Sequence, residues 1–120
     1  MIVPHPQDPA LTADELAQAA KLLVWVIWYE DQFHWGDERD SFPLAICLSQ
    51  EESEREYRRR IESGTNKPLT PGWDGITIEG PWTLMHEGQE HPWEYGVDVV
   101  REVLKRAKDG KPGPVFVPIR

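Results

Sequence analysis

Apolar residues recur at helical spacing near the start of the chain and predict a long first helix. The recurring positions are Leu16, Ala20, Leu23 and Ile27. Residues three or four apart share one face of a helix. Thr12 and Glu15 have the spacing of a capping box, which marks the N-terminal end of a helix, and Gly36 is a plausible stop. We therefore predict a helix over about residues 13–35.

The second half of this predicted helix is apolar on every side. All eight side chains from 22 to 29 are apolar or aromatic, and a helix of this kind must be covered all round. A chain of 120 residues has little material for that purpose. The pattern favours a homodimer in which the helix forms the subunit interface, with a central core helix in a monomer as the alternative.

Two further helices follow from capping and periodicity. A second capping box at Ser49–Glu52 opens a helix over about residues 50–63, which Gly64 closes. The third helix has Pro92 at its first position and ends before Gly110. Its apolar positions are Val97, Val100, Leu104 and Ala107.

The remaining apolar segments are short and predict a small sheet. Residues 42–48 fit either a strand or a buried turn of helix, while 76–78 and 82–85 flank a three-residue connection and predict a hairpin. The tail at 114–120 alternates in the manner of an edge strand. The fold predicted is α+β: three helices, one of them long and central, with a small antiparallel sheet or hairpin. Residues 1–120 form one domain, with extended arms at 1–11 and 111–120.

Composition narrows the class of protein. Hydrophobic residues make up 39% of the chain and charged residues 28%, which is typical of a globular domain. Twenty-one acids against 13 bases give a net charge of −8, which argues against direct binding of nucleic acid. The single cysteine, Cys47, fits a reducing compartment. The start of the chain lacks a signal-peptide pattern, and the run at 22–29 is too short to span a membrane, so we expect a soluble cytoplasmic protein.

Acidic blocks and tryptophans supply the candidate binding residues. Residues 30–56 contain nine acids and two bases, and residues 74–98 contain six acids and no base. Such blocks suit attraction to a basic protein surface, and tryptophan is enriched at binding hot spots. The candidate binding residues are Trp25, Trp28, Glu30, Asp31, Asp37, Glu38, Asp40, Trp73 and Trp93.

Three histidines are weak candidates for metal ligands. On a helix, His34 would lie one turn from Glu30, and a carboxylate with an imidazole at that spacing can share a metal. His86 and His91 are five residues apart with Gly88 between them, so they lack the one-face geometry of a helical zinc motif. No phosphate-binding or nucleophile motif is present in the sequence. We therefore assign no catalytic residue and no cofactor.

These patterns are typical of a protein that acts through its surfaces. We expect a small acidic cytoplasmic protein-binding module: an inhibitor, an adaptor or a phage-type accessory protein. It would form a homodimer and engage a partner protein with a basic surface, without binding nucleic acid or membrane directly. The alternatives are a metal-dependent enzyme with a histidine–carboxylate site, an acidic DNA mimic, and a structural subunit of a larger assembly.

Overall fold

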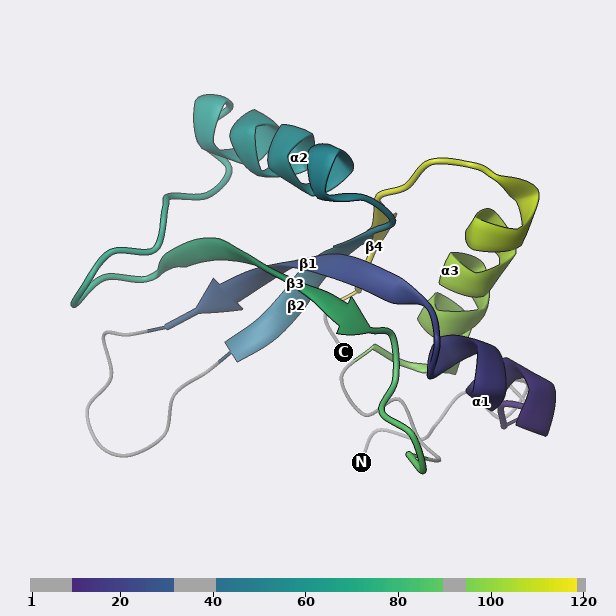
Figure 1. The fold of residues 1–120 in the computed structure, drawn as a ribbon. Coiled ribbons are helices and arrows are strands. Elements are labelled where there is room, and N and C mark those ends of the chain that lie inside the picture. The colour runs from purple at the N-terminus through teal and green to yellow at the C-terminus, as the bar shows by residue number, and fades with distance from the viewer. Residues whose placement is uncertain (1–9, 32–40, 90–94, 119–120) are drawn as a thin grey trace.

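The protein combines an antiparallel sheet with helices on one face and at one end (Figure 1). The computed structural model describes residues 10–31, 41–89 and 95–118. Within these ranges the elements in chain order are α1 (Ala13–Ala19), β1 (Leu23–Glu30), β2 (Ser41–Cys47), α2 (Gln50–Glu62), β3 (Gly75–Thr83), α3 (Val97–Asp109) and β4 (Val115–Phe116).

The four described strands lie in the order β3-β1-β2-β4, and each is antiparallel to its neighbours. β1 is therefore central, while β3 and β4 form the edges. The short β4 pairs with only Ala45 and Ile46 of β2. This arrangement confirms the predicted α+β class, with three helices and a small antiparallel sheet, and it confirms an edge strand in the C-terminal tail.

The prediction of one long first helix is wrong. The capping box at its start is present, because the Glu15 amide donates to Thr12 Oγ1 at 3.1 Å and the Thr12 amide donates to Glu15 Oε1 at 2.8 Å. The helix ends at Ala19, however, and 23–30 form the central strand. A run of apolar residues rich in Val, Ile and aromatics is also what a strand covered on both faces requires. α2 on one face and the α1–α3 pair on part of the other bury Val24, Val26 and Ile27 of this strand.

The argument for a homodimer loses its basis with that helix. Val24, Val26 and Ile27 are completely buried within this chain, so these three side chains need no second subunit to cover them. Trp25 and Trp28, expected on one helix, lie on opposite faces of β1 because strand side chains alternate. The oligomeric state itself stays a prediction.

The predicted hairpin at 76–85 is one continuous edge strand. β3 runs through Gly80 and Pro81, where these two residues stand opposite Trp25 alone as a β-bulge. Proline is tolerated here because β3 is an edge. Gly80 has φ +141°, and a Cβ at this position would lie 2.7 Å from the Val24 carbonyl oxygen. Only glycine fits this close approach of the two backbones.

Three other predictions concern shorter segments. Of the two alternatives for residues 42–48, the structure shows a strand, β2. α2 is confirmed, with Ser49 as its N-cap and Gly64 just beyond its C-cap. α3 ends as predicted at Gly110, which is left-handed at φ 66°. It begins at Val97 and not at Pro92, which lies outside the described residues.

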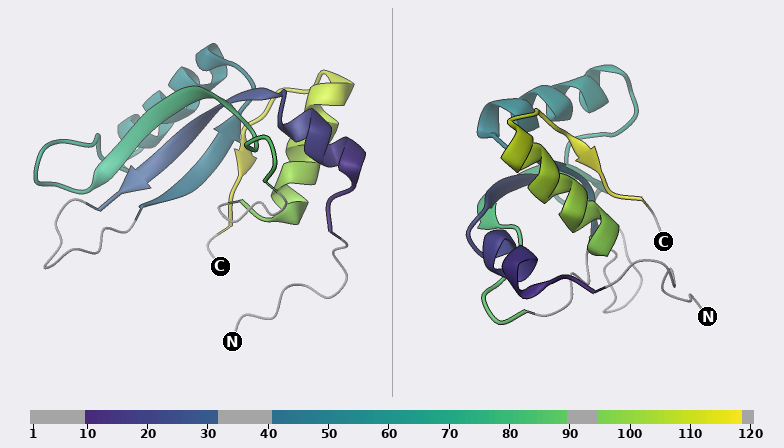
Figure 2. Two further views of the ribbon diagram at one scale, coloured as in Figure 1. Left: turned by 60° about the horizontal axis from the view of Figure 1, so that its bottom comes forward. Right: turned by 90° about the vertical axis from the view of Figure 1, so that its right-hand side faces the viewer.

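Two groups of buried side chains hold the sheet and helices together. The smaller group joins Ile27, Ala45 and Ile76 to Tyr57 and Ile61 of α2, so α2 covers one sheet face. The larger group lies between the sheet and the α1–α3 pair, which pack against each other at one end of the sheet (Figures 1 and 2). It extends into both predicted arms. Its members include Leu11, Val24, Val26, Ile46, Val99, Val100, Val103, Leu104 and Val115.

Candidate functional site

The sheet face opposite α2 is only partly covered by the described helices, and it carries the candidate site. Val24 and Val26 of this face lie in the core beneath α1 and α3. Farther along β1, alternation places Trp28 and then Glu30 on the same face. Both side chains are only half-buried. The face therefore continues beyond the core into an aromatic and acidic surface.

β3 completes this surface from the neighbouring position in the sheet. Trp82 pairs with Val24, Glu79 with Val26, and Thr77 with Trp28. All three β3 residues therefore share the face of their β1 partners. The bulge at Gly80 and Pro81 shifts the alternation by one residue, which is why positions 79 and 82 can lie on the same side.

The two tryptophans form an edge-to-face pair. The ring centroids of Trp28 and Trp82 are 6.3 Å apart and their planes meet at 73°, a favourable arrangement for aromatic quadrupoles. Trp28 also packs against the larger core, whereas Trp82 keeps 41% of its surface exposed. The contact with Trp28 thus holds an exposed indole ring in a defined orientation.

Two carboxylates accompany this aromatic pair. Burial, and in second place the negative charge of Glu30, raise the pKa of Glu79. Within the described part of the chain, neither the Glu30 nor the Glu79 carboxylate has a hydrogen bond or ion pair. We define the open sheet face as Trp28, Glu30, Thr77, Glu79 and Trp82. It can attract a cation by charge and hold it against an aromatic ring.

The structure separates the predicted binding residues. Trp28 and Glu30 lie together in the open sheet face, and Asp31 follows directly after β1. Trp25 is half-buried on the opposite face, and Trp73 is 68% exposed in the loop before β3. Outside the described residues lie Asp37, Glu38, Asp40 and Trp93.

Sequence reasoning missed Glu79 and Trp82 as partners of Trp28. Residues 76–85 do contain the relevant signal, since apolar Ile76 and Ile78 alternate with polar Thr77 and Glu79 as in a strand with two different faces. Reading a turn at 79–81 concealed the continuation to Trp82. Strand pairing brings Glu30 and Glu79, from separate acidic blocks of the sequence, onto one surface.

The weak metal candidates do not gather in the described structure. His86 is exposed beside α1, while His34 and His91 lie outside the described residues. In the ranges that are described, no three histidine, cysteine, aspartate or glutamate side chains are placed to hold one metal ion. The Cys47 thiol is fully buried, and burial is the main cause that raises its pKa to about 12, so it is a poor nucleophile.

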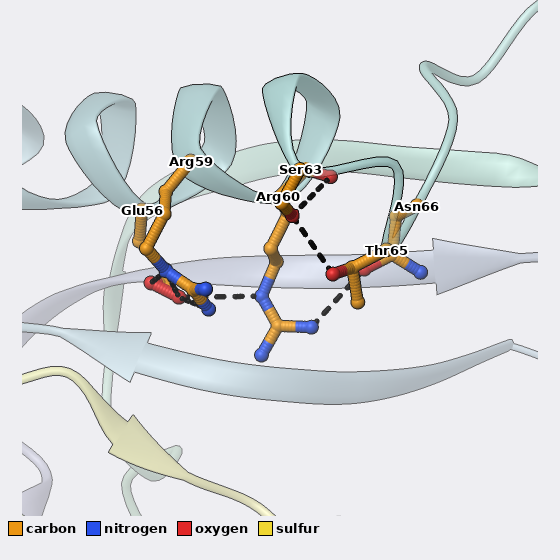
Figure 3. A network of polar contacts seen from close by, with 6 residues as sticks. All are labelled: Glu56, Arg59, Arg60, Ser63, Thr65 and Asn66. Atoms are coloured by element: carbon orange, nitrogen blue, oxygen red, sulfur yellow. Dashed lines mark hydrogen bonds and ion pairs between the residues drawn. The ribbon is translucent and has the colours of Figure 1, made fainter.

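The arginines at the end of α2 are engaged within the chain (Figure 3). Arg59 Nε donates to both carboxylate oxygens of Glu56 at 3.0 Å, and Arg60 Nε lies 3.5 Å from Glu56 Oε1. Arg60 Nη1 also donates to Asn66 Oδ1 at 3.1 Å, and its guanidinium carbon lies 5.8 Å from the ring centre of Phe116 in β4. These contacts pair both arginines with Glu56 on the preceding turn, and the contact with Phe116 links α2 to the sheet.

Comparisons with family models, with curated proteins and with solved structures gave no match to this chain. Among the helices of the described ranges, none has the length and apolar character needed to cross a bilayer.

Proposed function

We propose that this chain is a small protein-binding module that docks a basic segment of a partner protein on its open sheet face. The observation that carries the proposal is the pairing of Trp28 with the exposed Trp82 beside two carboxylates that have no cationic partner in the described chain. Aromatic residues with little rotamer freedom supply contact area at binding sites, and neighbouring charge selects the sign of the partner.

The proposed setting is the cytoplasm, and the class of activity is that of an inhibitor, adaptor or accessory factor. Support for a reducing compartment comes from Cys47, which is a free and buried thiol. The net charge of −8 adds long-range attraction for a basic partner.

Nuclear magnetic resonance titration tests this proposal directly. The uniformly labelled chain is titrated with a peptide that alternates lysine or arginine with glycine, at physiological ionic strength, and with a matched glutamate peptide. We expect saturable shifts of the backbone amides of Thr77 and Glu79 and of the indole N–H groups of Trp28 and Trp82. The indoles of Trp25 and Trp73 serve as internal controls, because they lie on the far face and in a loop.

A weak response spread over every acidic segment would contradict the proposal, since it would indicate general charge attraction. An equal response to the glutamate peptide would contradict it as well.

A further inference from the structure

We propose that the open sheet face holds one arginine side chain of the partner, with its guanidinium stacked on Trp82 and paired with the carboxylate of Glu79. This inference rests on the proposed function, which requires only a basic segment. It goes further by assigning the chemical group that is recognised and the two side chains that recognise it.

Trp82 provides the stacking surface. The residue is 41% exposed, and its edge-to-face contact with Trp28 restricts the orientation of its ring. An indole is the best aromatic partner for a cation, and a ring that is already fixed loses little entropy when a ligand stacks on it.

Glu79 provides the counter-charge at the adjoining position. Glu79 pairs with Val26 of β1. On the same face of β1, Val26 lies between Val24, which pairs with Trp82, and Trp28. The Glu79 carboxylate therefore lies in the stretch of face that the two tryptophans bracket. Glu30 lies on the same face, four positions farther along β1 than Val26, and its negative charge acts on Glu79 with no hydrogen bond or ion pair to a described cation at either carboxylate. A guanidinium at this point would relieve the repulsion between the two carboxylates.

The geometry favours arginine over lysine. A planar guanidinium can stack on an indole while its edge donates to a carboxylate, whereas an ammonium is a point charge that cannot do both over the same area. Arginine is also less strongly hydrated, so it loses less on entering a half-buried surface such as the one around Glu79. The open sheet face thus offers a flat ring and an acceptor side by side, which is the pattern arginine satisfies.

Fluorescence anisotropy with three labelled peptides tests the assignment. Each peptide alternates lysine with glycine and carries arginine, lysine or citrulline at its centre. We expect the arginine peptide to bind the unaltered protein about tenfold more tightly than the citrulline peptide and about threefold more tightly than the lysine peptide. Equal affinities for arginine and citrulline would overturn the inference.

Variants of the protein supply the second arm. Glu79→Gln should weaken binding of the arginine peptide about tenfold and Trp82→Leu about threefold, with smaller effects on the citrulline peptide. The matched controls are Trp73→Leu, which removes another exposed indole, and Glu87→Gln, which removes another exposed carboxylate. Both should leave the affinity within about twofold.

The outcomes separate this inference from the proposed function. If the basic peptides still shift the open sheet face but neither Glu79→Gln nor Trp82→Leu changes the preference for arginine, the arginine site is wrong and the docking face stands. If no basic peptide binds there, both are wrong. The peptide series uses the unaltered protein, so it decides the question even if Trp82→Leu fails to fold.

Discussion

Glu52 joins three parts of the chain, and its replacement should measure how much that junction contributes to stability. It lies in the first turn of α2 and is only 7% exposed. Its Oε1 accepts from the Leu48 amide at 3.2 Å, and its Oε2 accepts from the Gly113 amide at 2.9 Å. The carboxylate therefore links the end of β2, the start of α2 and the segment that leads to β4.

Glu52→Ala should destabilise the protein by about 3 kcal/mol. The substitution leaves two backbone N–H groups without their acceptor; a hydrogen bond to a charged group contributes roughly 1.5–3 kcal/mol, and the lower end of this range gives the total. With a urea m-value of about 1.5 kcal/mol/M, the unfolding midpoint should fall by about 2 M. Glu52→Gln keeps one acceptor oxygen and should lose about half as much.

Urea unfolding followed by tryptophan fluorescence measures the effect. Glu51→Ala is the control, because Glu51 is next to Glu52 in the chain and its side chain is exposed. The control should cost about 0.5 kcal/mol or less. Hydrogen exchange at the Gly113 amide adds a local readout and should accelerate in Glu52→Ala. A midpoint within about 0.3 M of the unaltered protein would refute the reasoning, because it would mean that water replaces both hydrogen bonds without cost.

Gly113 allows a double-mutant cycle at the same junction. A Cβ at Gly113 would lie 2.5 Å from Glu52 Oε1, so Gly113→Ala should be destabilising in the unaltered protein. Once Glu52 is alanine this clash is gone, and the second substitution should cost about 1 kcal/mol less than before. Strictly additive costs would show that the two residues do not interact.

Two further predictions concern ionisable groups. Because burial raises the pKa of Cys47 to about 12, its thiol should react with a thiol reagent at least about a hundredfold more slowly in the native protein than in urea; comparable rates would contradict its burial. The hydrogen bond from Arg101 is the main cause that lowers the pKa of Glu15 from 4.5 to about 2. The pair should therefore add about 1 kcal/mol of stability that is complete above about pH 5 and lost as the pH falls toward 2. Urea unfolding of Arg101→Gln at several pH values checks this sign, and a deficit that does not change with pH would show it to be wrong.

Local signals in the sequence determined the ends of helices. The hydroxyls of Thr12 and Ser49 cap α1 and α2 as their spacing indicates. Gly64 and Gly110 both adopt positive φ just beyond a helix. These features depend on neighbours a few residues away, so the sequence alone carries them. The Glu52 carboxylate departs from the capping-box pattern, because the end of β2 and the chain before β4 present amides that compete for it.

Only the β1 part of the candidate site could be predicted from local patterns in the sequence. Trp28 and Glu30 could be selected from the sequence as an aromatic residue beside an acidic block. Their relation to Glu79 and Trp82 depends on the pairing of β1 with β3 and on the bulge that lets positions 79 and 82 face the same side. The spacing of residues within one segment does not indicate how that segment pairs with a distant one, so the open sheet face could not be predicted from the sequence.

Residues 22–29 show which property the sequence determines and which one depends on the tertiary structure. A uniformly apolar run predicts a segment that is buried on all sides; Val24, Val26 and Ile27 are fully buried, whereas Leu23 at the start of β1 is 50% exposed. The run does not state whether helix or strand achieves the burial, because periodicity vanishes when every position is apolar. The strand forms because of its tertiary neighbours. β2 and β3 supply backbone hydrogen bonds to β1 on both sides, while α2 covers one of its faces and α1 with α3 cover part of the other.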